Sequence, residues 1–190
     1  MVGGGIGAGK GVVSRILSAR DIAVISADDV GHAVLEPGGA AFADVASRWP
    51  SVVVDGLIDR SRLAAIVFTD SGELERLEAL THAAIIESIA EQVRGTVGPV
   101  AVEVPVLLPL DDGLRGGWRR VFVDADEQLR IERAVARGGN EDDVRRRVAA
   151  QVDRETWLDW ADDVIENNGT VEELEARVNA FVDDLVASTK

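Results

Sequence analysis

The sequence predicts an α/β fold in which a parallel sheet is flanked by helices. Three observations support this prediction: a glycine-rich stretch at the N-terminus, short runs of valine and isoleucine, and helical periodicities between those runs. Short apolar runs are typical of strands that are buried in a parallel sheet. Parallel strands need crossover connections, and the helical segments between the runs supply them.

The N-terminal stretch has the pattern of a phosphate-binding loop. Residues 4–10 read G-x-x-x-x-G-K and end at Lys10. Glycines let successive backbone N–H groups turn inward around an anion, and a helix that starts near Gly9 adds its own N–H groups. Lys10, one of two lysines in the chain with Lys190, would reach the β- and γ-phosphates of a nucleotide. The alternative, an unstructured glycine-rich leader, is disfavoured by the helical pattern that follows. We expect nucleotide contacts from Gly5, Gly7, Ala8, Gly9, Lys10, Gly11 and Val12.

Two features of this stretch depart from the usual motif. Gly11 stands where a serine or threonine hydroxyl normally ligates Mg²⁺. Only Met1 and Val2 precede Gly3, so either the first strand is a stub or the chain begins late relative to its natural start. We therefore expect no certain protein ligand for Mg²⁺, with the phosphates and water holding the ion, and weakened magnesium binding with a lower rate.

The segments behind the loop alternate between helix and strand. Apolar spacing predicts a helix over 12–19, and the run 22–25 predicts a buried parallel strand. Asp28 follows this strand, at the sheet edge where open α/β folds bind ligands. We interpret it as a general base for an acceptor hydroxyl. The alternative for Asp28 is the N-cap of a helical turn over 30–35, and Asp29 is a cap or a solvated acid.

The middle of the chain interrupts this alternation. Residues 40–92 carry mostly helical spacing, with a brief extended piece at 52–54 before an Asp-Gly turn. We interpret this block as a helical insertion into the sheet domain.

The second half returns to strands and helices. We expect strands at 100–104, 121–123 and 163–165, and a helix over 127–137. Asn140 is predicted to cap the charged segment 140–154, and Thr170 with Glu173 to cap a closing helix. Glu103 interrupts an apolar strand; it either organises magnesium through water, lies on an edge strand, or forms a buried salt bridge.

Arginines share one face of the predicted helix over 127–137. Arg130, Arg133 and Arg137 follow an i, i+3, i+7 spacing. On a segment that closes over a nucleotide they would stabilise charge on the γ-phosphate. The alternative is a solvated or salt-bridged face.

Composition excludes several classes of protein and site. The formal charge of −14 argues against binding to nucleic acid or to an anionic membrane. The chain has no cysteine, which excludes disulfides and thiolate chemistry. His32 and His82 lack partners at metal-ligand spacing, and the four tryptophans are typical of packing. No apolar run is long enough for a membrane span and no leader suggests export, so we expect a cytoplasmic protein.

Taken in order, these motifs resemble those of the dephospho-CoA kinase family, P-loop kinases that complete coenzyme A synthesis. The glycine-rich loop is similar to the family's G-G-I-G-S-G-K-S, and Ser26-Ala27-Asp28 is similar to its D-A-D. The departures fall at Gly11, Ser26, Ala83 and Pro109. The matching segments are residues 4–11, 26–28, 36–38, 56–60, 77–83, 105–109, 133–137, 147–151 and 161–169.

The resemblance implies a fold, a reaction and a set of site residues. The fold would be a P-loop kinase-like parallel sheet with a nucleotide-binding core at 1–35, 96–132 and 155–190, a helical acceptor-binding subdomain at 36–95 and a lid at 133–154. The reaction would be ATP-dependent phosphorylation of the ribose 3′-hydroxyl of dephospho-CoA, with Mg²⁺, giving coenzyme A and ADP. Catalysis would fall to Lys10, Asp28 and Arg137. Further nucleotide contacts would come from Arg133, Arg137, Asn167 and Gly169, and acceptor contacts from Asp28, Arg60 and His82.

Two alternatives to this enzyme stay open on the sequence. One is a silent relative that binds only nucleotide or coenzyme A, and the other is a related small-molecule kinase. The expected small-molecule partners are ATP and dephospho-CoA. We expect the protein to be a monomer or weak oligomer.

Overall fold

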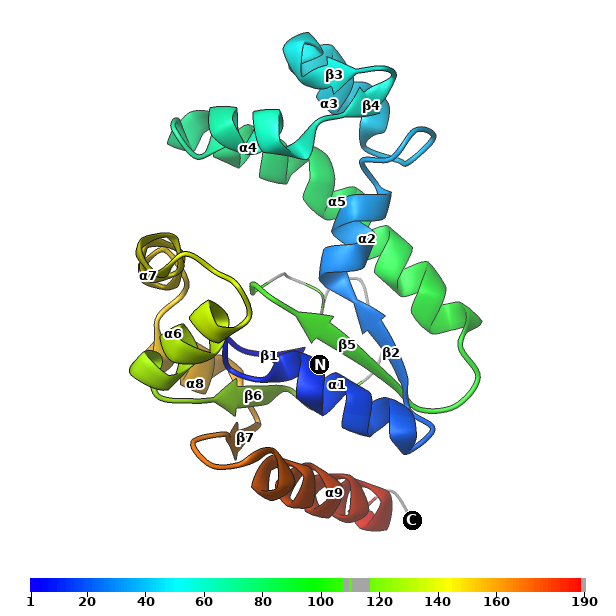
Figure 1. The fold of residues 1–190 in the computed structure, drawn as a ribbon. Helices are drawn as coiled ribbons and strands as arrows, with labels where there is room; N and C mark the ends of the chain where they lie inside the picture. The colour runs from blue at the N-terminus through cyan, green and yellow to red at the C-terminus, as the bar shows by residue number, and fades with distance from the viewer. Residues whose placement is uncertain (108–109, 111–116, 189–190) are drawn as a thin grey trace. The chain divides into compact units, whose positions relative to one another are not determined.

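The computed structural model describes residues 1–107, 110 and 117–188 of the chain (Figure 1). Leu108 and Pro109, where the sequence resembles the family's P-L-L-x-E, lie outside the described residues. The chain forms two compact units. The first holds the described residues of Met1–Ser26, Thr96–Leu108 and Gly116–Lys190, and the second holds Ala27–Gly95 with Leu110. The boundary at Ala27 precedes the one that we predicted at residue 36.

The first unit is built on a parallel sheet, as predicted. Across the described residues it has five strands in the order β2-β5-β1-β6-β7, and every pair is parallel. The strands are β1 (Val2–Gly3), β2 (Ala23–Ser26), β5 (Val100–Val104), β6 (Val121–Asp124) and β7 (Asp163–Glu166). The first strand is a stub of two residues, yet it is central, because Val2 pairs with both Glu103 and Val121.

The strand that we expected to be buried at 22–25 corresponds to β2, which is an edge strand. Its outer side has no neighbour in the described sheet, Ala23 is exposed, and Ile25 is its one buried residue. The apolar run predicted the strand correctly and its burial wrongly, because periodicity does not report the order of strands in a sheet.

Five helices of the first unit are described. They are α1 (Lys10–Ala19), α6 (Glu127–Ala136), α7 (Glu141–Ala149), α8 (Arg154–Trp160) and α9 (Val171–Ser188). The predicted caps are confirmed: the Asn140 side chain accepts a hydrogen bond from the Asp143 amide. The Thr170 amide donates to Glu173 and the Glu173 amide donates to the Thr170 hydroxyl, which is a reciprocal capping box. The sequence analysis did not predict α8.

The core of the first unit lies on both faces of the sheet. On one face, α1 and α9 pack side by side over the strands, with Leu17, Leu174 and Val178 in the same buried cluster as Val123 (Figure 1). On the other face Trp157 of α8 stacks on Phe122 of β6 at 5.7 Å. Burying side chains of this size stabilises the fold by about 1.5–3 kcal/mol each, so these two layers hold β1 and the loop that follows it.

The second unit is mainly helical, as expected for 40–92. Its elements are α2 (Ala27–Ala33), α3 (Phe42–Arg48), the 3₁₀ turn η1 (Pro50–Val52), β3 (Val53–Val54), β4 (Leu57–Ile58), α4 (Arg60–Val67) and α5 (Ser71–Gly95). The strands β3 and β4 form a small antiparallel hairpin. Its two-residue turn needs positive φ at both positions, which Asp55 (51°) and Gly56 (79°) provide.

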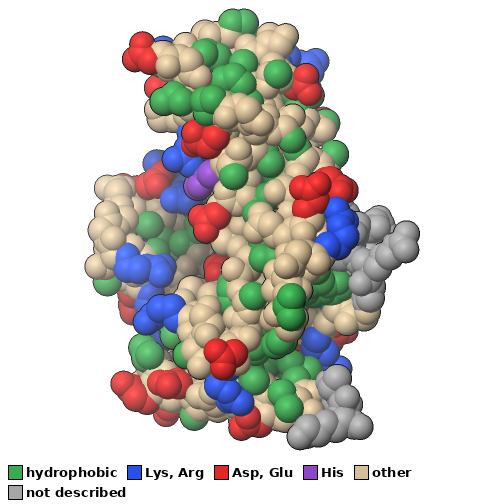
Figure 2. Space-filling view, turned by 90° about the vertical axis from the view of Figure 1, so that its right-hand side faces the viewer, with side chains coloured by type: hydrophobic (Ala, Val, Ile, Leu, Met, Phe, Trp, Pro, Cys, Tyr) green, Lys and Arg blue, Asp and Glu red, His purple; other side chains and the backbone are tan. Residues whose placement is uncertain are grey.

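None of the helices described is both long and apolar enough to cross a membrane. Figure 2 shows one face of the molecule, on which acidic, basic and apolar side chains are interspersed.

Candidate functional site

The loop between β1 and α1 curves through backbone conformations that glycine favours. Gly7 and Gly9 have φ of 78° and 107°. A Cβ at Gly7 would overlap the backbone carbonyl of Arg130, and one at Gly9 would overlap the side-chain amide of Asn167. Glycine is therefore required at both positions, by backbone conformation and by the close approach of neighbours.

Lys10 is the first residue of α1 and folds back over the loop. Its Nζ donates a hydrogen bond to the Gly4 carbonyl at 2.8 Å and a longer one to the Gly5 carbonyl at 3.4 Å. Because the first amides of a helix have no partner carbonyl within the helix, the start of α1 directs N–H groups and the positive end of its dipole into the loop. The ammonium and these amides make a local positive site in an acidic protein.

Three predicted nucleotide residues come together around this loop. The buried Asn167 donates from Nδ2 to the Ala8 carbonyl at 2.7 Å. Arg133 donates to the Asn167 carbonyl at 2.8 Å and to the Gly169 carbonyl at 3.1 Å. The loop, α6 and the segment after β7 are thus linked in one hydrogen-bonded group.

Arg130 and Gln151 also contact the loop. The sequence analysis considered Arg130, with Arg133 and Arg137, as a stabiliser of γ-phosphate charge, and it gave Gln151 no role of its own. Both bind the backbone of Ile6: Arg130 Nε donates to its carbonyl at 2.9 Å, and the Gln151 side-chain oxygen accepts from its amide at 2.9 Å. The signal in the sequence that pointed to Arg130 was the helical face that it shares with Arg133. Gln151 was noted only as part of a family pattern.

Val12 and Arg137, two further predicted nucleotide residues, are not among the described residues whose side chains bond to the loop. Val12 lines a groove of about 420 Å³ between α1 and α9, together with Arg15 and Val171. Arg137 follows the last residue of α6 and is exposed; in the described part of the chain its side chain forms no ion pair or hydrogen bond. Its predicted catalytic role stays a prediction.

Two side chains, those of Glu103 and Ser14, bring oxygen atoms that could bind a hydrated cation close to α1. The Ser14 hydroxyl donates to Glu103 Oε2 at 2.5 Å. Glu103 is not on an edge strand, because β5 lies between β2 and β1, and among the described residues it forms no salt bridge. Two of the three interpretations of Glu103 are therefore wrong for the described chain, and the interpretation as an organiser of magnesium through water stays a prediction.

Gly11 is exposed on the first turn of α1. A Cβ added there meets no atom within 4 Å, and its φ lies outside the left-handed region. A serine would therefore fit at this position without strain. No group of three or more potential metal-binding side chains occurs within the described residues.

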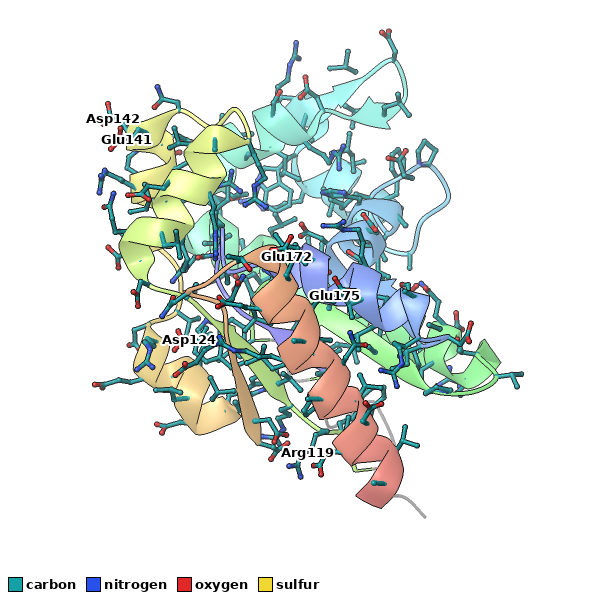
Figure 3. All side chains as sticks on the ribbon, turned by 60° about the horizontal axis from the view of Figure 1, so that its bottom comes forward. Arg119, Asp124, Glu141, Asp142, Glu172 and Glu175 are labelled. Atoms are coloured by element: carbon teal, nitrogen blue, oxygen red, sulfur yellow. The ribbon has the colours of Figure 1, made fainter. Side chains whose placement is uncertain are left out.

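A second cavity beside the loop has the wrong charge for phosphate. It measures about 350 Å³ and lies between the β6–α6 turn and the α7–α8 turn. Four carboxylates and two guanidinium groups line it; one of the latter, on Arg154, binds Asp124 Oδ2 at 2.7 Å. Figure 3 labels Asp124 next to α8. Since acids outnumber bases there, the positive loop is the better anion site.

The predicted acceptor residues all belong to the second unit. Asp28 and Arg60 are exposed and His82 is half-buried. They lie on α2, α4 and α5, and both α2 and α4 pack against α5. Asp28 is the second residue of α2, which begins at Ala27, so it is not the N-cap of a helix over 30–35.

Comparisons with known proteins agree on one family. Residues 1–173 match the family described as CoaE, dephospho-CoA kinase. A dephospho-CoA kinase of Methylococcus capsulatus is 42% identical over 183 residues, covering 94% of this chain and 91% of that protein. One of Corynebacterium efficiens is 38% identical over 196 residues, covering 98% and 96%.

Solved structures give the same fold. TT1252 from Thermus thermophilus superimposes with a TM-score of 0.82 at 29% identity, covering 97% of this chain and 95% of that one. The dephospho-CoA kinase from Campylobacter jejuni has a TM-score of 0.71 at 21% identity, covering 100% and 97%.

Proposed function

The chain belongs to the dephospho-CoA kinase family, and we propose how its own residues carry out the reaction of that family, the ATP-dependent phosphorylation of dephospho-CoA to coenzyme A. The chain is a kinase, a phosphotransferase with an alcohol as acceptor. The observation that supports the proposal most is the loop of residues 4–9, with Lys10 and Asn167 bonded to its backbone carbonyls.

The donor site is the loop together with the start of α1. The residues assigned to the triphosphate are Gly5, Gly7, Ala8, Gly9, Lys10, Gly11 and Val12. The Ala8 and Val12 amides already donate to the carbonyls of Gly5 and Gly9, so the remaining amides of this set are the ones proposed to bind phosphate. Lys10 exchanges its bonds to the loop carbonyls for the β- and γ-phosphates. Asn167, Gly169 and Arg133 lie by the adenine. Arg137 faces the γ-phosphate, where a guanidinium stabilises the charge that spreads over the transferring group.

The donor site would hold magnesium without a direct hydroxyl ligand from the loop. Gly11 offers no hydroxyl, so the nucleotide phosphates and water supply most of the oxygen ligands that Mg²⁺ prefers. Glu103, held by Ser14, would bind the hydrated ion. When bound, the ion supplies charge neutralisation at the β- and γ-phosphates.

The acceptor half of the reaction belongs to the second unit. Arg60 and His82 bind dephospho-CoA, and the Asp28 carboxylate accepts the proton of the ribose 3′-hydroxyl. The freed oxygen bonds to the γ-phosphorus as the bond from that phosphorus to the bridging oxygen breaks, which releases ADP. Residues 133–154 act as a lid over the phosphates.

A second candidate function is a relative that binds nucleotide and does not turn over. The observation that favours it is Gly11, because the missing hydroxyl removes a direct magnesium ligand. A related kinase with a different small acceptor is tested by the same assay with other alcohols. The protein is proposed to act in the cytoplasm. It is also proposed to be a monomer or weak oligomer, and light scattering of the purified protein tests this oligomeric state.

The deciding experiment measures coenzyme A and ADP formed from ATP, Mg²⁺ and dephospho-CoA. We expect Asp28→Asn to lower kcat by about 10²–10⁴-fold, the usual contribution of a general base, while ATP binding persists. Lys10→Ala is expected to lower kcat and to weaken ATP binding. Asp29→Asn is the matched control, because Asp29 is the exposed neighbour of Asp28 in the same helical turn. Binding of ATP by the wild type without product would support the silent relative instead.

A further inference from the structure

Ile6, in the middle of the phosphate-binding loop, is held at three points. Its amide donates to the Gln151 side chain at 2.9 Å, and its carbonyl accepts from Arg130 Nε at 2.9 Å. Its side chain packs against the apolar cluster between α6 and α7, whose members are Ile131, Ala134, Val144 and Val148. Residues more than 120 positions away in sequence therefore contact the amide, the carbonyl and the side chain of Ile6.

Arg130 and Gln151 are also bonded to each other. Arg130 Nη2 donates to the same Gln151 oxygen at 2.8 Å, which closes a ring of three hydrogen bonds with the Ile6 backbone. Burial lowers the pKa of Arg130, but an arginine guanidinium stays charged at any physiological pH. The bonds that it donates are therefore charge-assisted, which makes them stronger than neutral ones.

The ring forces the loop and the helices close together. A Cβ at Gly5 would overlap the Arg130 guanidinium, and one at Gly7 would overlap the Arg130 backbone. The glycines on either side of Ile6 are thus the places where α6 touches the loop.

We propose that Arg130 and Gln151 are positioning residues that fix the turn of residues 5–7, so that the loop is shaped for phosphate before a nucleotide arrives. We call the ring of Arg130, Gln151 and the Ile6 backbone the loop clamp. The proposal rests on the donor site proposed above and adds residues to it.

The physical reason is the flexibility of glycine. A loop with glycines at 4, 5, 7 and 9 loses more conformational freedom on ordering than a loop of the same length built from residues with side chains. If that cost fell at the moment of binding, phosphate affinity would drop by the same amount. Holding Ile6 in the unliganded protein moves the cost into folding. The clamp then serves phosphate binding and leaves adenine and the acceptor unaffected.

The test compares ADP with adenosine by titration calorimetry on the full chain. Gln151→Leu removes the shared acceptor. We expect its Kd for ADP to rise about tenfold, which corresponds to about 1.4 kcal/mol, while its Kd for adenosine stays unchanged. In the assay its KM for ATP rises and its KM for dephospho-CoA does not. Gln151→Glu keeps an acceptor oxygen beside Arg130 and is expected to bind ADP like the wild type.

Two further variants keep the proposal testable. Arg130→Lys retains the charge but not the forked pair of donors, so it is expected to weaken ADP binding even if Gln151→Leu does not fold. Gln128→Leu is the matched control, because Gln128 lies exposed on the same α6 and bonds only Glu132 among the described residues.

The outcomes separate the clamp from the donor site itself. Equal losses for ADP and adenosine, or no loss in Gln151→Leu and Arg130→Lys, would overturn the clamp while wild-type ADP binding still supports the donor site. If the wild type binds ADP no better than Lys10→Ala does, the donor site fails and the clamp fails with it.

Discussion

Asn167 Nδ2 donates a hydrogen bond to the Ala8 carbonyl at 2.7 Å and joins residues 159 positions apart. The amide is buried, and it lies where a Cβ on Gly9 would be. The segment after β7 therefore supports the loop directly, and Arg133 supports that segment in turn by binding the Asn167 carbonyl.

This relationship predicts a loss of stability and of nucleotide affinity in Asn167→Leu. The change leaves the Ala8 carbonyl without this donor, which costs about 1–3 kcal/mol in unfolding free energy for a buried group. Urea unfolding measures the stability and calorimetry measures the Kd for ADP. Asn168→Leu is the control, since Asn168 is exposed and bonds Asp126. A stability loss in the control as large as that in Asn167→Leu would contradict the assignment.

Gly11→Ser is expected to strengthen magnesium use. The site has room for a side chain, and serine restores the hydroxyl that usually ligates the ion. We expect the Mg²⁺ concentration for half-maximal rate to fall several-fold, because serine adds one direct oxygen ligand to the ion. Gly11→Ala, which adds the Cβ without the oxygen, is the control. An unchanged magnesium dependence in both variants would show that Gly11 does not limit the reaction.

Glu103→Gln and Ser14→Ala test the second oxygen donor. If Glu103 binds hydrated magnesium, Glu103→Gln weakens Mg²⁺-dependent ADP binding more than metal-free ADP binding. Ser14→Ala is expected to have the same effect at smaller size, because it only orients the carboxylate. Calorimetry with and without Mg²⁺ gives the comparison. Equal losses in the two conditions would make Glu103 a purely structural residue.

Asp153 predicts a measurable pH dependence of stability. Its side chain accepts from the Thr156 amide at the start of α8, and this hydrogen bond lowers the pKa of Asp153 below 3.8. The charged form is thus favoured in the folded state. Its contribution is complete above the unfolded pKa, near 3.8, and is lost as the pH falls through the lower folded value.

The variant for this test is Asp153→Asn, which keeps a capping oxygen but cannot titrate. We expect the variant to have a lower thermal midpoint than the wild type at pH 6. Between pH 5 and about pH 2, where Asp153 of the wild type becomes protonated, we expect the variant to lose less stability than the wild type. An identical acid transition in the two proteins would show that Asp153 does not contribute to it.

Local patterns in the sequence were sufficient for most elements of the fold. The caps at Asn140 and Thr170, the strand at 100–104 and the turn at 55–56 were predicted because each depends on residues within a few positions of itself. The resemblance to the family added the reaction, the acceptor residues and the nucleotide residues outside the loop. The helix α8 was missed because its seven residues are short for a periodicity and are dominated by charged and aromatic side chains.

The sequence by itself determined the parallel α/β fold and the phosphate-binding loop, since these follow from spacing along the chain, and its motifs indicated the family by resemblance. Only the tertiary structure decided that β2 is an edge strand, that Glu103 accepts from Ser14, and that Gln151 holds Ile6. Those contacts join segments up to 145 residues apart. The packing of helices against the sheet sets such distances, and no periodicity in the chain encodes them.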